Sequence, residues 1–287
     1  DHNITTGQIY LSVIGKERKG ELLGKCVQII PHITDEIKER IKEITGKSNV
    51  DCTTVEIGGT VGDIESLPFL EAARQLRLEE GSTNVIYVHV TLVPILDVVG
   101  EQKTKPTQHS VQELRRIGIQ PDVVVVRSQS PLKEEPKRKI ALFCNIEERA
   151  VFTSPDVKSI YEIPLILDEQ GLGDYLLERI GVRANKANWE DWRKMLEGFI
   201  APKNIVAIAI CGKYAELADS YVSVNEALRH AGASNNASVK ISWVETEAFE
   251  DEPSRIQELG NCDGILIPGG FGPRGTEGKI MAISYAR

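Results

Sequence analysis

Short, nearly continuous apolar runs alternate along the chain with segments of helical periodicity. The runs at 84–93, 121–127 and 139–145 read NVIYVHVTLV, PDVVVVR and KIALFCN. Runs of this length, rich in β-branched side chains, are typical of strands buried on both faces of a parallel sheet. Repeated alternation of strand and helix predicts a doubly wound α/β domain.

Two helices are predicted ahead of these strands. Residues 32–46 place isoleucines three and four apart, with Thr34 as the expected N-cap. Residues 65–81 offer Ser66 as an N-cap and Gly81 as a terminator. Both segments therefore carry start or stop signals in addition to an apolar face.

A second α/β pattern follows a change of composition near residues 181–203. Strands are predicted at 204–214, 237–245 and 262–272, and a helix at 219–232. A chain of 287 residues is long enough for two domains of ordinary size. We therefore expect a first domain over residues 1–184, a helical linker over 185–203 and the beginning of a second domain over 204–287.

Composition excludes several classes of protein. The net charge of −8 argues against a surface devoted to nucleic acid. The five cysteines are widely spaced and form no C-x-x-C pair, which favours free thiols in a reducing, cytoplasmic compartment. No apolar run approaches the roughly 20 residues of a membrane span. We expect an acidic cytoplasmic protein with neither nucleic-acid nor membrane partners.

Two lysines, Lys103 and Lys105, stand directly ahead of a predicted helix that follows the strand at 84–93. Residues 110–113 read SVQE, the form of a capping box, with Thr107 as an alternative cap one turn earlier. A helix N-terminus presents free N–H groups and attracts anions, and lysines beside it add positive charge. The segment predicts a site for several negative charges; the competing interpretation is a solvated loop with ordinary surface lysines.

A glycine-rich turn in VEIGGTVGDIES, residues 55–66, carries three acidic side chains. Glu56 stands near the end of a predicted strand, TTVEI, where a carboxylate is suited to Mg²⁺ bound with phosphate. Asp63 and Glu65 are acceptors for an amino or hydroxyl group. The alternative is a structural turn whose acids cap the helix that begins near Ser66.

Two further features are ambiguous when taken alone. Lys139 begins the predicted strand KIALFCN but belongs to a basic run, and such runs are usually solvated. Gly269 and Gly270 follow a buried run in GILIPGGFGPRGTEG, where backbone N–H groups can form an oxyanion hole. A glycine-rich loop without a function is the alternative there. ICGKY, around Lys213, lacks the earlier glycine and the Ser or Thr of a P-loop.

Five segments together resemble the CTP synthase family, in its order and with its spacing. They are VEIGGTVGDIESLPFLEA, GEQKTKPTQHSVQELRRIGIQPD, KIALFCN, SIYEIP and IPGGFGPRGTEG. The resemblance extends over essentially the whole chain. It implies a P-loop NTPase-like amidoligase domain, similar to dethiobiotin synthetase, followed by part of a class I glutamine amidotransferase domain.

The resemblance also implies a reaction. The family makes CTP from UTP: ATP phosphorylates the uracil 4-oxygen, and ammonia from glutamine then displaces the phosphate. Mg²⁺ accompanies the nucleotides, GTP is an allosteric activator, and CTP is a feedback inhibitor. The family further suggests a homotetramer with nucleotide sites near subunit interfaces.

Site residues follow from the resemblance position by position. The implied ligand of Mg²⁺ is Glu56, and the glutamine site and oxyanion hole involve Gly269 and Gly270. The turn that contacts adenine is Pro155, Asp156 and Val157, where Pro155 replaces the family's usual lysine. The GTP-linked lid includes Arg274, Gly275 and Glu277. The implied UTP and CTP residues are Asp63, Ile64, Glu65, Lys103, Thr104, Lys105, Pro106, Thr107, Gln108 and Lys139.

Some of the family's machinery is absent from these 287 residues. The family's P-loop and a second acidic metal ligand precede the matched region, and its nucleophilic Cys, with a His and a Glu, follows it. We expect a chain truncated at both ends that alone neither phosphorylates UTP nor hydrolyses glutamine. Two alternatives stay open: another glutamine-dependent amidoligase, and a non-catalytic nucleotide-binding paralogue.

Overall fold

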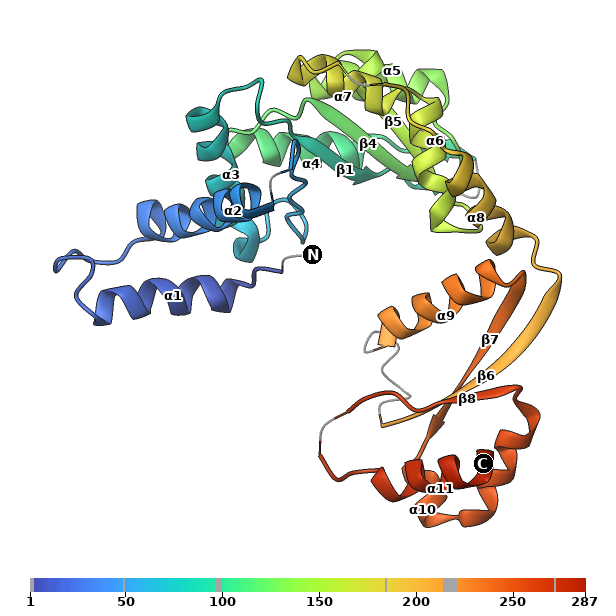
Figure 1. Cartoon of the computed structure of the whole chain (residues 1–287). Helices are drawn as coiled ribbons and strands as arrows, with labels where there is room; N and C mark the ends of the chain where they lie inside the picture. The colour runs from blue at the N-terminus through green and yellow to red at the C-terminus, as the bar shows by residue number, and fades with distance from the viewer. Residues whose placement is uncertain (1–2, 49, 97–99, 184, 214–220, 271) are drawn as a thin grey trace. The chain divides into compact units, whose positions relative to one another are not determined.

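The computed structural model describes residues 3–287 except 49, 97–99, 184, 214–220 and 271 (Figure 1). The chain forms two compact units. Unit 1 comprises Asp1–Val157 and Ile163–Asn185, and unit 2 comprises Lys158–Glu162 and Lys186–Arg287. Within the described residues, no helix combines the length and apolar character that crossing a membrane requires.

Unit 1 contains a parallel sheet in the order β1-β4-β5. Its strands are β1 (Val88–Leu92), β4 (Val123–Ser128) and β5 (Val151–Pro155), with Val88 opposite Val123 and Val124 opposite Val151. Because the strands are parallel, their carboxyl ends meet at one edge of the sheet. The predicted strands at 84–93 and 121–127 are confirmed. β5 was not predicted.

Helices cover both faces of this sheet. Successive residues of β4 point to opposite sides: Val124 and Val126 contact the cluster beneath α4 (Lys105–Arg116) and α5 (Glu134–Cys144), whereas Val123 and Val125 contact the opposite cluster. That second cluster includes Phe152 and residues of α6 (Ile163–Glu169) and α7 (Leu172–Ile180). The doubly covered α/β prediction is confirmed.

The predicted strand KIALFCN is wrong, because these residues form the second half of α5. Ile140, Ala141 and Cys144 are buried on one helical face, whereas Leu142 and Phe143 are exposed at 76% and 53%. A short apolar run does not by itself distinguish a buried strand from a buried helix segment. The acids ahead of it, Glu134 and Glu135, and the proline that follows them, are first-turn helix signals.

The predicted strand TTVEI is also wrong, since no strand is formed among residues 53–57. Val55 is 47% exposed. Ile57 and Val61 pack instead against a cluster that includes Leu70 of α3 (Leu67–Glu80) and Leu114 of α4. This packing places the glycine-rich turn by side-chain contacts, without a β ladder.

Among the described residues before position 81, every regular element is a helix, and loops connect these helices. The elements are α1 (Thr6–Arg18), the π-helix η1 (Ile29–Ile33), α2 (Thr34–Ser48), the 3-10 helix η2 (Ile64–Ser66) and α3 (Leu67–Glu80). Ile9, Ile37 and Ala72 meet in their core. Thr34 is not a side-chain cap, because its hydroxyl donates to the Pro31 carbonyl at 3.0 Å.

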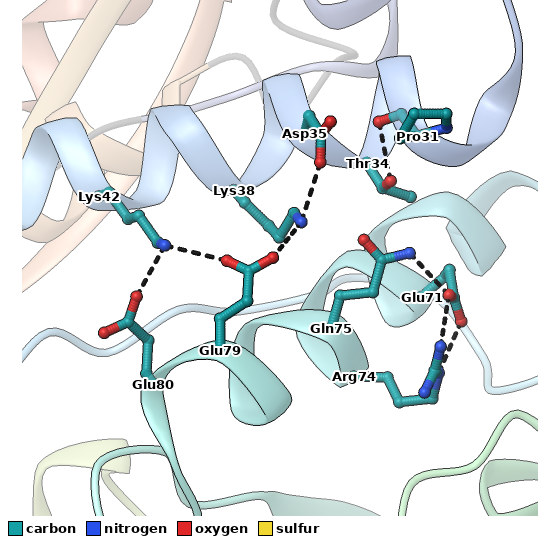
Figure 2. Close-up of polar contacts among 10 residues, drawn as sticks. All are labelled: Pro31, Thr34, Asp35, Lys38, Lys42, Glu71, Arg74, Gln75, Glu79 and Glu80. Carbon is teal, nitrogen blue, oxygen red and sulfur yellow. Dashed lines mark hydrogen bonds and ion pairs between the residues drawn. The ribbon is translucent and has the colours of Figure 1, made fainter.

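Alternating charges join α2 to α3 along one line (Figure 2). Lys38, which is buried, contacts Asp35 at 2.9 Å and also Glu79. Lys42 contacts Glu79 at 3.0 Å and Glu80 at 2.7 Å. Each partly exposed pair contributes little alone. The apolar contacts between the helices therefore supply most of the stability, and the charged side chains add contacts between α2 and α3.

Unit 2 contains a second parallel sheet, in the order β7-β6-β8. Its strands are β6 (Asn204–Gly212), β7 (Ala237–Glu245) and β8 (Gly264–Leu266). The predicted strands are confirmed within these bounds, and the start of the predicted helix at 219 lies outside the described residues. The helices are α8 (Glu190–Ile200), α9 (Val222–Ser234), α10 (Glu247–Asp251) and α11 (Thr276–Ala286), with the 3-10 segment η6 (Pro253–Asn261).

Residues 158–162 leave unit 1 and return to it. Within them Tyr161, in the 3-10 turn η4 (Ile160–Glu162), stacks on Phe199 with ring centroids 4.8 Å apart. Its hydroxyl donates to Glu226 at 2.8 Å and also contacts His230, while Trp192 donates to its carbonyl at 2.8 Å. These contacts explain why this short segment belongs to unit 2.

Candidate functional site

The lysine segment 103–108 is fastened to the carboxyl end of β1. The Lys103 N–H donates to the Pro94 carbonyl at 2.9 Å, and the Thr107 hydroxyl donates to the Leu92 carbonyl at 3.2 Å. The buried Gln108 side chain donates to the Thr104 hydroxyl at 3.0 Å. This attachment fixes the direction in which the N-terminus of α4 points.

Helix α4 begins earlier than the sequence predicts. Thr104 occupies the N-cap position and Lys105 is the first helical residue. Ser110 therefore lies inside the helix, so the predicted capping box at 110–113 is wrong. Lys105 and Pro106 are exposed and Lys103 is half-buried, so the charged side chains stand at the surface while the residues that anchor the helix are covered.

Lys139 lies in α5 and not at the start of a strand, so that part of the prediction is wrong. Its ammonium pairs with Glu135 at 2.7 Å, and Lys103 pairs with Glu101 at 2.6 Å. The pKa of Lys139 is raised, first by its hydrogen bond to Glu135 and also by the charge of Glu101. The geometric connection between the two lysines is Gln102, which precedes Lys103 and accepts from the Lys133 N–H at the start of α5.

The acidic turn is a separate feature of unit 1. The Asp63 carboxylate accepts from the Thr60 N–H at 3.0 Å, and Ile64 is 84% exposed. Glu56 and Glu65 are exposed as well. The neighbouring Ile57 and Val61 pack near Leu114. Because Leu114 lies nine residues after Lys105, the turn meets α4 about 13 Å along its axis from the lysines.

The turn at 155–157 lies at the same sheet edge as the lysine segment. Pro155 ends β5 opposite Ser128, and the Asp156 N–H donates to the Ser128 carbonyl at 3.0 Å. The exposed Asp156 carboxylate pairs with Arg127 at 3.2 Å. The carboxyl ends of parallel strands are where α/β sheets bind ligands. The structure therefore gathers residues 103–108 and 155–157 at the edge where a ligand is expected.

In unit 2 the glycine loop follows β8 and lies against two lysines. A side chain at Gly270 would meet Lys279 Nζ at 3.7 Å, whereas Gly269 has open space. Lys213 donates to the Gly272 carbonyl at 2.5 Å, and Lys279 donates to the Pro268 carbonyl at 3.0 Å. Burial, with the charge of Lys213, lowers the pKa of Lys279. The loop is therefore held by cations from two separate elements.

Residues 274–278 open helix α11 and are bound to α10. Arg274 pairs with Glu247 at 2.5 and 2.8 Å. Gly275, with φ of 67°, accepts from the Thr246 hydroxyl at 2.9 Å. Glu277 is exposed. The conformation of this segment thus depends on contacts with residues 246–250.

Comparison with known proteins gives the family. Residues 1–182 match the family described as CTP synthase N-terminus, and residues 216–287 match glutamine amidotransferase class-I. The chain belongs to the CTP synthase family. The CTP synthase of Pyrococcus abyssi is 58% identical over all 287 residues, and that of Carboxydothermus hydrogenoformans is 56% identical over 285. The chain spans 53% of each of these relatives, about half their length.

Because the chain belongs to the CTP synthase family, the alternative of a different glutamine-dependent amidoligase is wrong. The structure also adds residues that the sequence reasoning missed: Glu101, Gln102 and Arg127 at the edge of the unit 1 sheet, and Lys279 beneath the glycine loop. Arg127 ends the apolar run PDVVVVR. A charged residue at the carboxyl end of a predicted strand could have been recognised from the sequence as a candidate site residue. Gln102 and Lys279 are recognised only from contacts with residues at least 11 positions away, whereas Glu101 is recognised from its ion pair with Lys103.

His89 lies in β1 and is a buried, structural residue. It is 8% exposed and its Nε2 lies 2.9 Å from the Ser110 hydroxyl. Burial lowers the pKa of His89 below its ordinary value of 6.5. The folded protein therefore holds this imidazole neutral at a pH where the unfolded chain protonates it.

This burial predicts a loss of stability in acid. Below about pH 6.5 the unfolded state binds more protons at His89 than the folded state, so the free energy of unfolding falls as pH falls. Between about pH 7.5 and 5.5, wild type should lose on the order of 1 kcal/mol more than His89→Gln. Urea unfolding at both pH values measures the difference. Equal losses in the two proteins would contradict the assignment.

Proposed function

We propose that the complete protein carrying this chain is a CTP synthase, which aminates UTP with nitrogen from glutamine at the expense of ATP. The observation that carries the proposal is the lysine arrangement: Lys103 and Lys105 lie at an anchored helix N-terminus, and Lys139 lies in the helix whose start is bound by Gln102. A net acidic protein that gathers cations at one sheet edge is suited to a polyanionic ligand.

Each residue of the lysine segment has a distinct task. Lys103, Lys105 and Lys139 pair with the triphosphate of UTP, and the free N–H groups of α4 add donors. Thr104, Thr107 and Gln108 are buried and hydrogen-bonded, so they hold the helix start rather than the ligand directly. Pro106 stands in the first turn, where its missing N–H costs nothing.

ATP is the second nucleotide. We assign Asp156 and Val157 to contacts with adenine, and Pro155, which has no side-chain donor, to shaping the turn. The backbone bond between Asp156 and Ser128 holds this turn against β4. UTP and ATP would then meet at one edge of one sheet, as a transfer of phosphate between them requires.

Mg²⁺ is the expected companion of both triphosphates. No group of three or more His, Cys, Asp or Glu side chains among the described residues is arranged to hold a metal. Glu56 is one exposed carboxylate, and Mg²⁺ is commonly held by one or two carboxylates together with substrate phosphates. Glu56 therefore fits as one ligand of a phosphate-bound ion. The ion would neutralise charge on the transferred phosphoryl group.

We assign Asp63, Ile64 and Glu65 to the site of CTP feedback inhibition. No hydrogen bond or ion pair connects these three residues to 103–108 in the part of the chain that is described. Their packing away from the lysines fits a homotetramer in which nucleotide sites lie near subunit interfaces. In that arrangement a second copy brings the two segments together.

In unit 2 we assign Gly269 and Gly270 to the glutamine site and its oxyanion hole, and Arg274, Gly275 and Glu277 to the lid linked to GTP. The open space at Gly269 supports this, because a carbonyl oxygen needs close access to backbone N–H groups. We accordingly divide the chain into an amidoligase domain, a linker and the start of an amidotransferase domain at 1–184, 185–203 and 204–287.

A reducing, cytoplasmic setting fits the thiols. The five cysteines are all free, and burial raises the pKa of both Cys144 and Cys211 to about 11. Thiols with so high a pKa are scarcely ionised and are poor nucleophiles. Cys144 and Cys211 are therefore core residues and not catalytic ones.

Formation of CTP tests the proposal. The complete protein, given UTP, ATP and Mg²⁺ with either ammonia or glutamine, should yield CTP that chromatography separates from UTP. Omission of ATP should abolish the product. Hydrolysis of ATP without amination of UTP would contradict the assignment. The 287-residue polypeptide assayed in parallel is expected to form no CTP and to hydrolyse no glutamine.

A further inference from the structure

Residues 101–103 at the lysine site alternate between surface and interior: the first and third side chains lie at the surface and the second is buried. Glu101 and Gln102 form the short strand β3 (Glu101–Gln102), which pairs with β2 (Ile95–Leu96), and Lys103 follows. Side chains alternate across a strand. Glu101 and Lys103 accordingly lie together as an ion pair at the surface, whereas Gln102 points inward and is only 6% exposed.

The buried amide of Gln102 bonds entirely to backbone on another segment. Its Nε2 donates to the Pro131 carbonyl at 2.9 Å and to the Ser130 carbonyl at 3.4 Å. Its Oε1 accepts from the Lys133 N–H at 2.9 Å. Both the donor and the acceptor ends of this amide are used, and both hold the loop between β4 and α5.

Lys133 is the N-cap residue of α5, and no side chain caps that helix from within. Gln102 therefore supplies, from across the fold, the contact that fixes where α5 starts. Lys139 follows six residues later, about 9 Å along a rigid helix. A shift of the helix start is transmitted directly to Lys139.

We propose that Gln102 is a positioning residue, which sets the distance between Lys103 and Lys139 and thereby shapes the triphosphate site; the proposal rests on the UTP assignment above. Lys103 directly follows Gln102 in the sequence. Lys139 lies in α5, and the hydrogen bonds of Gln102 hold the loop from which α5 starts. A neutral amide performs this task without adding a charge that would repel or compete for phosphate. The side chain itself does not touch the nucleotide.

Replacement of Gln102 by methionine keeps the volume and removes both hydrogen-bonding ends. In the complete protein, Gln102→Met should raise the KM for UTP about tenfold, because a displacement near 1 Å is costly at a charged site. The KM values for ATP and for glutamine should stay within about twofold, since neither ligand uses this pair of lysines. A general loss of structure would instead change all three.

Gln120 provides a matched control at the other end of the same helix. Its amide donates to the carbonyls of Cys144 at 3.0 Å and Pro121 at 3.1 Å. Gln120→Met therefore also removes backbone contacts of α5, but near its C-terminus and away from Lys139. Its KM for UTP should be unchanged.

A second pair of variants leaves the buried amide intact, in case Gln102→Met does not fold. Lys133 has φ of −72°, which proline adopts without strain. Lys133→Pro removes the N–H that Gln102 accepts, whereas Lys133→Ala removes only the side chain. Lys133→Pro should raise the KM for UTP severalfold above that of Lys133→Ala. Equal values for the two would overturn the proposal.

A double-mutant cycle with Lys139→Met tests the positioning role of Gln102 separately from the assignment of Lys139 to the UTP site. If Gln102 acts through Lys139, Gln102→Met should change the KM for UTP less than twofold when Lys139 is already replaced. Full additivity would overturn the positioning role. If Lys139→Met alone leaves the KM for UTP unchanged, the UTP assignment itself is wrong.

Discussion

Lys105→Ala in the complete protein should weaken the binding of UTP by about 30-fold, the scale of about 2 kcal/mol for a hydrogen bond to a charged group. Lys105 is the first residue of α4 and is exposed, and no described residue forms an ion pair with it. Its removal therefore takes charge from the ligand without leaving a protein carboxylate unpaired. Isothermal titration with UTP in the absence of glutamine measures the effect directly.

Two controls accompany this variant. Lys25→Ala removes an exposed lysine from the loop that follows α1 and should leave the affinity for UTP unchanged. The KM for glutamine should be the same in wild type and Lys105→Ala. An equal loss of UTP and glutamine binding would remove Lys105 from the triphosphate site.

Gly198→Ala should destabilise unit 2 by about 3 kcal/mol, the upper range for overpacking of a close contact. Gly198 lies within α8, and an added Cβ there would stand 2.3 Å from the Ala233 carbonyl oxygen of α9. That distance forces the two helices apart and disturbs the face on which Tyr161 stacks. Denaturant unfolding followed by tryptophan fluorescence reports it, since Trp192 lies in α8.

Gly15 is the matched control, because it too lies inside a helix. An added Cβ at Gly15 in α1 meets nothing within 4 Å. Gly15→Ala should therefore raise stability by about 0.8 kcal/mol, the ordinary difference in helix propensity. Similar effects of the two substitutions would show that α8 and α9 do not pack as described.

Strands that are buried on both faces were predictable from their composition. In VVVV of β4, alternate valines contact opposite clusters, so the apolar run is continuous and short. The strand β7 lies within its predicted bounds, 237–245. In such cases local β propensity and tertiary burial favour the same structure.

Prediction failed where a short segment carried weak or conflicting signals. VFTSP of β5 has Thr, Ser and Pro among its five residues, so its composition resembles a loop although four of the five are buried. KIALFCN has the composition of a strand but the burial period of a helix. Whether such a short segment becomes a strand or a helix depends on the residues that pack against it in the fold, and local sequence does not specify those residues.

The candidate site shows the same division. Lys103 and Lys105 were recognisable because they stand at the start of a helix. The connection of Lys139 to Lys103 depends on the hydrogen bonds of Gln102 to residues about 30 positions away. Likewise Lys213 reaches Gly272, 59 residues further on. Contacts at such separations are set by topology, which local patterns do not encode.

Transfer of isotope tests the central claim most directly. The complete protein should be supplied with UTP, ATP, Mg²⁺ and glutamine labelled with heavy nitrogen in its side-chain amide. We predict CTP that carries the label, with one ADP formed for each CTP. Glutamine hydrolysed without labelled CTP, or ATP consumed without amination of UTP, would contradict the account.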